Sequence, residues 1–131
     1  MSDEPLKQVL IAEDDKPARD LLRLALEHER IAIDIAEDGP TALKKLAAAQ
    51  FDLLILDMML PGKSGQEVIR EAGRGGKTSP PILVTTGAHI DGSSEKKLLS
   101  EPNVVGLVRK PVLISRFRET VYGILKIPPP A

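Results

Sequence analysis

The chain has 131 residues, which predicts one domain, and its 42% hydrophobic and 28% charged residues are typical of a globular protein. A net charge of −1 and a pI near 6.1 leave no basic surface for a phosphate backbone, and cysteine is absent, so we expect neither a nucleic-acid partner nor thiolate chemistry. No signal-peptide pattern and no apolar run of roughly 20 residues occurs, which predicts a cytoplasmic protein without membrane contact.

The first half of the chain alternates short apolar segments with helical patterns. Residues 9–12 predict a strand, and residues 16–30 predict a helix because their apolar residues recur three and four positions apart. Pro17 suits the first turn of that helix, where its missing N–H has no partner to lose. Residues 31–36 alternate only weakly and predict an edge strand, and residues 38–49 predict a second helix.

The second half continues the same alternation. Its predicted elements are a strand at 51–57, a helix at 65–73, a strand at 81–87, a short helix at 93–101, a strand at 104–110 and a helix at 115–126. Strands this rich in Val, Ile and Leu are typical of a parallel sheet that is buried on both faces. Five strands alternating with five helices therefore predict an α/β fold with a doubly wound parallel sheet.

Polar residues collect where the predicted strands end. Glu13 and Asp14 follow the first strand, Asp57 ends the third, Thr86 the fourth and Lys110 the fifth. Ligands of open α/β sheets bind at these carboxyl ends. If the first and third strands are neighbours, three carboxylates converge, and two like charges near 4 Å repel by about 4 kcal/mol at an effective dielectric of 20. A hard divalent cation such as Mg²⁺ and an ammonium would compensate them.

The segments VLIAEDD, LLILDMMLPGKSG, PILVTTG and RKP, in this order, resemble the receiver domain of bacterial two-component response regulators. The resemblance covers about residues 8–126. It implies a (βα)₅ flavodoxin-like topology with strand order 2-1-3-4-5. We expect a single, stand-alone receiver domain over residues 1–131, with residues 127–131 as a proline-rich tail.

The resemblance also implies a role for each matching residue. Asp57 matches the phosphoacceptor, whose carboxylate attacks the phosphorus of a phosphohistidine. Asp14 matches a direct Mg²⁺ ligand, Glu13 a ligand that acts through water, and the backbone carbonyl of Met59 the third ligand from the protein. The loop after the third strand, with its proline and glycines, is expected to turn that carbonyl toward the metal.

Two further matches complete the expected site. Thr86 matches the hydroxyl that binds a phosphoryl oxygen, and Lys110 matches the lysine that pairs with the carboxylate or the phosphoryl group. Pro111 matches a proline that follows a cis peptide bond. Leu107 departs from the family, which usually has an aromatic switch residue there. We therefore expect phosphorylation to move or order residues 87–103, while Leu107 stays packed.

The expected function is that of a phosphoacceptor which takes its phosphoryl group from a histidine kinase or phosphotransfer protein and signals by conformational change to a downstream protein. Such a domain catalyses only its own phosphorylation and dephosphorylation, and a second copy, in a homodimer, is a further candidate partner. One alternative is an adaptor that has the fold but does not depend on phosphorylation. A second is an aspartate-nucleophile phosphatase, which would need a second acid where Met59 stands.

Several residues have simpler interpretations. Asp15 is expected to cap the first helix, and the side chain of Met58 to serve in packing or at the rim of the site. His28 and His89 are expected to be solvated, since no further ligand or nucleophile pattern accompanies them.

Overall fold

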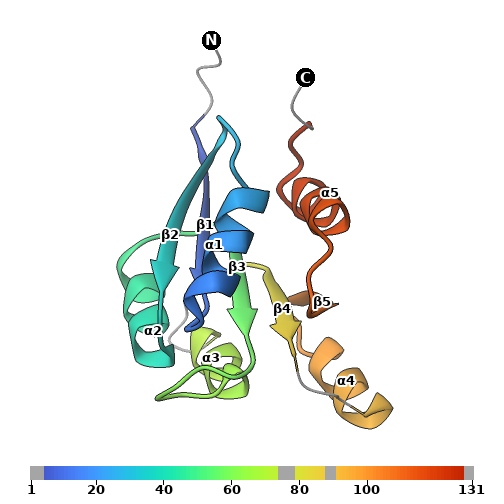
Figure 1. Ribbon diagram of the computed structural model, residues 1–131. Helices are drawn as coiled ribbons and strands as arrows, with labels where there is room; N and C mark the ends of the chain where they lie inside the picture. The colour runs from blue at the N-terminus through green and yellow to red at the C-terminus, as the bar shows by residue number, and fades with distance from the viewer. Residues whose placement is uncertain (1–4, 74–78, 88–90, 129–131) are drawn as a thin grey trace.

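A computed structural model describes residues 5–73, 79–87 and 91–128. One sheet contains five parallel strands in the order β2-β1-β3-β4-β5, which confirms the predicted topology. The paired strands run parallel, so their carboxyl ends lie at the same edge of the sheet, and β2 and β5 are its edge strands (Figure 1). The strands are β1 (Lys7–Ala12), β2 (Ile31–Ala36), β3 (Leu53–Asp57), β4 (Ile82–Thr86) and β5 (Val104–Arg109).

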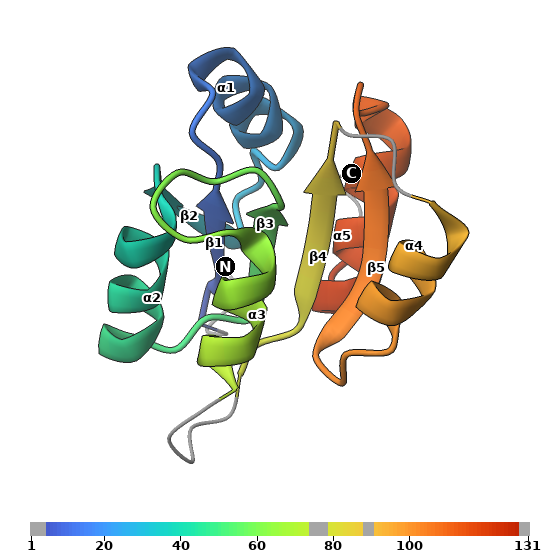
Figure 2. The ribbon, with the colours of Figure 1, turned by 90° about the horizontal axis from the view of Figure 1, so that it is seen from below.

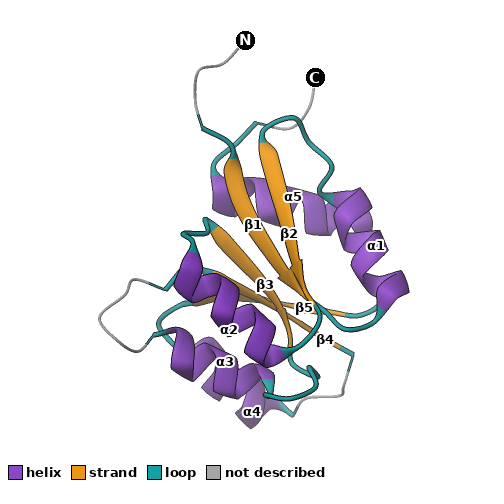
Figure 3. Cartoon of the chain, turned by 90° about the vertical axis from the view of Figure 1, so that its left-hand side faces the viewer, coloured by secondary structure: helices purple, strands orange, loops and turns teal. Residues whose placement is uncertain are grey.

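Helices cover both faces of the sheet. They are α1 (Lys16–Ala25), α2 (Gly39–Ala48), α3 (Gly65–Ala72), α4 (Gly92–Leu99) and α5 (Ile114–Leu125). Figure 2 shows α2, α3 and α4 following one another on one side, and Figure 3 shows α1 and α5 on the opposite side. None of the helices within the described ranges is long and apolar enough to cross a membrane.

Each helical layer buries its own apolar cluster against the sheet. The α1/α5 layer packs on β-strand residues such as Ile11 and Ile55, and Phe117, one of its two buried aromatic residues, is 2% exposed. The α2/α3/α4 layer packs on the alternate strand residues, such as Leu54 and Leu56. Because β1, β3 and β4 are covered on both faces, they form a rigid platform for the residues at their carboxyl ends.

The start of α1 follows the prediction, but its end does not. Asp15 caps the helix by accepting a hydrogen bond from the backbone N–H of Ala18 at 3.1 Å, and Pro17 lies in the first turn, as expected. The helix ends at Ala25 rather than at residue 30. Arg118 of α5 donates from Nε to the Ala25 carbonyl at 2.8 Å, which satisfies a carbonyl at the helix end.

Candidate functional site

Three carboxylates meet at the carboxyl edge of the sheet. The register pairs Ala12, the last residue of β1, with Leu56 of β3, so Glu13, which follows β1, lies at the same level as Asp57, which ends β3. Glu13 is 1% exposed and Asp57 is 3% exposed, whereas Asp14 is exposed. One carboxylate oxygen from each of these three residues lies within 4.8 Å of the others. Glu13, Asp14 and Asp57 are called the acidic cluster below.

The ammonium of Lys110 joins the two buried members of the cluster. It donates to Oε1 of Glu13 and lies 3.5 Å from Oδ2 of Asp57. The backbone N–H of Lys110 donates to the Thr86 carbonyl at 2.8 Å, which fixes the end of β5 beside β4. The peptide bond between Lys110 and Pro111 is cis, as the resemblance implied. The predicted convergence of Glu13, Asp14, Asp57 and Lys110 is therefore observed.

The charges of the cluster are not fully compensated. Burial, together with the hydrogen bond to Asp57, raises the pKa of Glu13 to about 7, although the hydrogen bond from Lys110 lowers it. Burial alone would lower the pKa of Lys110, but its bond to Glu13 and the charge of Asp57 raise that pKa above its ordinary value. Three carboxylates thus share one ammonium, and a divalent cation would supply the missing positive charge.

The donor set also suits such a cation. Mg²⁺ binds carboxylate and carbonyl oxygens and keeps several water molecules, so it needs only a few oxygens from the protein. The acidic cluster offers three oxygens close together, and the exposure of Asp14 leaves one side of the cluster open to water. These residues therefore fit a magnesium site, and the contribution of the Met59 carbonyl stays a prediction.

The loop after β3 has a fixed shape beside Asp57. The backbone N–H of Met59 donates to Oδ1 of Asp57 at 3.1 Å, while its side chain is 68% exposed. Gly62 has φ +83°, a conformation that favours glycine. A Cβ at Gly65 would lie 2.7 Å from Cα of Met58, so only glycine fits there. Met58 is therefore in close contact with Gly65, in keeping with the expected packing role of its side chain.

The end of β4 contributes two buried threonines. Thr86, the predicted phosphoryl-binding residue, is 1% exposed. Its backbone carbonyl accepts from the N–H of Lys110, just after β5. Thr85 is equally buried, and its hydroxyl has no hydrogen-bond partner among the described residues. A Cβ at Gly87 would lie 3.7 Å from Cδ of Lys110, so a small residue leaves room for the lysine.

Two features were not expected from the sequence. Arg19 of α1 donates to the backbone carbonyls of Glu13 and Asp14, and no charge pattern pointed to it. His28 is half-buried rather than solvated: its ring packs edge-on against Tyr122 at 5.4 Å, and its Nδ1 accepts from the Arg30 N–H. The other histidine, at position 89, lies outside the described residues.

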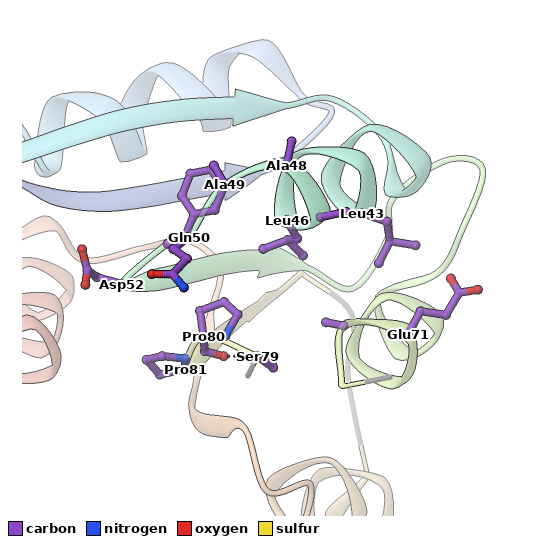
Figure 4. A pocket seen from close by; sticks show the side chains of 13 residues that line it. Leu43, Leu46, Ala48, Ala49, Gln50, Asp52, Glu71, Ser79, Pro80 and Pro81 are labelled. Carbon is purple, nitrogen blue, oxygen red and sulfur yellow. Dashed lines mark hydrogen bonds between the residues drawn. The ribbon is translucent and has the colours of Figure 1, made fainter. Parts of the chain in front are cut away.

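A pocket of about 750 Å³ lies at the other end of the sheet (Figure 4). Leu43 and Leu46 of α2 line one side of it, and Pro80 and Pro81 before β4 line another. Asp52, just before β3, also lines the pocket, whereas Asp57 ends the same strand at the acidic cluster. The pocket is therefore separate from the candidate site.

The doubly wound sheet and the acidic cluster at its carboxyl edge define a class of α/β domains that place their chemistry at the strand ends. Residues 9–122 match the response regulator receiver domain family, and the chain belongs to that family. This confirms the resemblance that the strand-end motifs indicated.

Individual relatives agree with the family assignment. The chain is 44% identical over 78 residues to the transcriptional regulatory protein ResD of Bacillus subtilis, a match that covers 60% of this chain and 32% of ResD. It is 38% identical over 80 residues to the response regulator ArlR of Staphylococcus saprophyticus, covering 61% of this chain and 36% of ArlR. The chain thus spans about a third of the length of these curated relatives.

Solved structures give the same fold. The response regulator TrrA of Thermotoga maritima, solved in complex with Mg²⁺–BeF, is 34% identical with a TM-score of 0.75, covering 91% of this chain and 99% of TrrA. The receiver domain of a putative LuxO repressor protein from Vibrio parahaemolyticus has a TM-score of 0.85 over 92% of this chain and 91% of its own. At 24% identity, the second likeness shows the fold alone.

Proposed function

We propose that Asp57 accepts a phosphoryl group from a histidine kinase or phosphotransfer protein in a Mg²⁺-dependent reaction. The observation that supports this most is the convergence of the carboxylates of Glu13, Asp14 and Asp57 beside the ammonium of Lys110. The 34% identical TrrA structure supports it further, because that protein was solved in complex with Mg²⁺–BeF.

In this proposal the acidic cluster and the backbone carbonyl of Met59 hold Mg²⁺. Asp14 binds it directly, since it is the exposed member, and Glu13 acts through water. When bound, the ion would neutralise charge on the oxygens of the phosphoryl group. The burial of Glu13 and Asp57 fixes their side chains, so little reorganisation is needed at the moment of transfer.

Asp57 is the nucleophile of the proposed transfer. One carboxylate oxygen forms a bond to phosphorus as the phosphorus–nitrogen bond of the donor breaks, and the electron pair of that bond goes to the imidazole nitrogen. The product carries a charge of about −2 near neutral pH. Lys110, already 3.5 Å from Asp57, serves as its counter-ion, and the hydroxyl of Thr86 binds a phosphoryl oxygen.

The wider activity is proposed on the same basis. We propose that the residues form one receiver domain with its core at about 8–126, that it acts in the cytoplasm, and that it signals by conformational change to a downstream protein or a second copy. It would catalyse only its own phosphorylation and dephosphorylation. The absence of a nucleic-acid partner stays a prediction for these 131 residues.

The two alternatives have weaker support. An adaptor that does not depend on phosphorylation has no use for three clustered carboxylates, two of them buried, that repel one another. A phosphatase of the aspartate-nucleophile type needs an acid two residues after Asp57. Met59, at that position, has no acidic group.

Labelling with a small acyl-phosphate donor tests the proposal. Wild-type protein with Mg²⁺ should gain one phosphoryl group that hydroxylamine removes, and EDTA should prevent the gain. Asp57→Asn should remain unlabelled. Asp52→Asn is a matched control, because Asp52 precedes the same strand at its opposite end and its carboxylate accepts from the backbone N–H of Gln8. Undiminished labelling of Asp57→Asn would contradict the proposal.

A further inference from the structure

Arg19 spans two loops at the carboxyl edge of the sheet. Its Nη1 donates to the Asp14 carbonyl at 3.0 Å and to the Glu13 carbonyl at 3.3 Å. Its Nη2 lies 3.3 Å from Oε1 of Glu37, in the connection between β2 and α2. The Arg19 side chain is 13% exposed, whereas that of Glu37 is 69% exposed. The guanidinium is therefore packed into the edge of the site rather than solvated.

These contacts hold the short loop between β1 and α1, residues 13–15. The loop carries Glu13 and Asp14, two members of the acidic cluster. The Arg19 side chain donates to the backbone carbonyls of these two residues and not to their carboxylates. The backbone N–H of Arg19 also donates to the Asp15 carbonyl at 2.9 Å. All three carbonyls of the loop are thus bonded to one residue of α1, which fixes the direction in which the side chains of Glu13 and Asp14 leave the backbone.

The chemistry of the contact requires arginine. A guanidinium is planar and presents several N–H groups in a fixed fork, so it can bond two carbonyls and a carboxylate at once. The ammonium of lysine is a point charge on a flexible stem and does not reproduce this geometry. A purely electrostatic contribution of Arg19 would act in the opposite direction, because a cation beside the acidic cluster repels a metal ion.

We infer that Arg19 is a positioning residue, which holds Glu13 and Asp14 in the arrangement that binds a divalent cation. The inference rests on the proposed function of the acidic cluster and extends it by one residue. Partners that orient metal ligands typically contribute 10- to 100-fold in metal affinity. Arg19 does so through the backbone of the loop and does not touch the phosphoryl group.

Calorimetric titration with Mg²⁺ alone separates positioning from charge. Arg19→Ala should bind Mg²⁺ about tenfold more weakly than wild type. Arg23→Ala is the matched control: Arg23 lies one turn further along α1, is exposed, and makes no side-chain contact with the loop that the structure shows. It should bind within twofold of wild type. Equal or tighter binding by Arg19→Ala would overturn the inference, since removing charge alone tightens binding.

Two further measurements keep the test independent of folding and of the metal. Arg19→Lys keeps the charge and should show an intermediate loss of Mg²⁺ affinity, with a thermal transition as cooperative as that of wild type. In metal-free protein, hydrogen exchange at the amides of residues 13–16 should quicken in Arg19→Ala but not in Arg23→Ala. Unchanged exchange would overturn the inference. If wild type binds no Mg²⁺, the proposed metal site fails, and the exchange result alone decides whether Arg19 holds the loop.

Discussion

The two sides of the site are built differently. On one side, the loop after β1 is bonded by Arg19, and α1 behind it buries Leu22 and is joined to α5 through Arg118. On the other side, the eight-residue α4 has one fully buried side chain, Leu98, and an ion pair from Glu95 to Arg109 of β5. Both helices begin with an aspartate cap, so the difference lies in packing and not in helix initiation.

The comparison indicates where a change of shape is least costly. Segments with few buried apolar contacts open at lower free energy than the rest of a domain. The metal side of the site must stay in place for its ligands to converge, whereas α4 can shift without disturbing them. Leu107 of β5 is half-buried and packs against the apolar cluster of the α2/α3/α4 layer, in keeping with the expectation that it stays packed. Its behaviour on phosphorylation stays a prediction.

Truncating one buried leucine on each side should lower the free energy of unfolding by different amounts. Leu22 and Leu98 are 2% and 3% exposed, so the area that alanine removes is similar. We expect Leu22→Ala to lower the free energy of unfolding by about 4 kcal/mol and Leu98→Ala by about 2 kcal/mol, because α4 can relax locally. Urea denaturation measures both, and Leu24→Ala, at a position 59% exposed, is the control with little change. Equal losses would remove the distinction between the two helices.

The charge on the metal side should appear in the pH dependence of stability. The pKa of Glu13 is raised from 4.5 to about 7 in the folded, metal-free protein, so its protonated form is favoured by folding. Its contribution is therefore fully present below pH 4.5 and is lost as the pH rises to about 7, by up to about 3 kcal/mol.

Urea denaturation in EDTA across this pH range checks the effect. Glu13→Gln cannot titrate at this position and should show a flatter profile. The same decline in wild type and Glu13→Gln would mean that another group is responsible. Magnesium should make the decline of the wild type smaller, because a bound cation favours the carboxylate and lowers the folded-state pKa of Glu13 toward its ordinary value.

A phosphoryl mimic should affect the α4 side more than the metal side. With beryllofluoride and Mg²⁺, we expect amide exchange in residues 87–103, of which 88–90 lie outside the described residues, to change about tenfold, or about 1.4 kcal/mol, because α4 has few buried contacts. The amides around Leu107 should change little. Hydrogen exchange with and without the mimic measures this, and Asp57→Asn is the control. Changes centred on Leu107 with residues 87–103 unaffected would contradict the expectation.

The ion pair of α4 should give the smallest effect. Glu95 and Arg109 lie 2.6 Å apart with side chains 31% and 51% exposed, so Glu95→Gln should change the free energy of unfolding by less than about 0.5 kcal/mol. Exchange within α4 should nevertheless quicken about twofold, since the pair links the helix to β5. Asp20→Asn, which breaks a comparable exposed pair with Lys16 in α1, is the control without local effect. A loss above 1 kcal/mol would show that the α4 side is held more firmly than its burial indicates.

The strand ends that carry the acidic cluster could be predicted from the sequence for a physical reason, whereas the order of the strands was implied by the family resemblance. Short, unbroken apolar runs that end at Glu13 or Asp57 indicate strands buried on both faces, and parallel strands bring such ends to one edge. The cap at Asp15 was equally visible, because capping depends on a local hydrogen bond.

Features that depend on distant backbone groups could not be predicted. The end of α1 at Ala25 is bonded by Arg118, which is 93 positions away, and no glycine or proline marks it in the sequence. Arg19 reads as one more charged residue of an amphipathic helix, because its partners are carbonyls that every residue has. The half-buried position of His28 likewise follows from Tyr122, on a helix that comes much later in the chain.

The wide separation of the site residues in sequence has a consequence for how the protein matures. Lys110 meets Glu13 across 97 positions and Asp57 across 53, so no fragment that stops before β5 contains the complete site. On the proposed function, a nascent or truncated chain without β5 would lack the lysine that pairs with Asp57. If Mg²⁺ binds only the folded protein, at 100 times its dissociation constant it adds about 2.7 kcal/mol to stability. Binding of the ion would then favour the folded protein, and only the folded protein would contain the complete site.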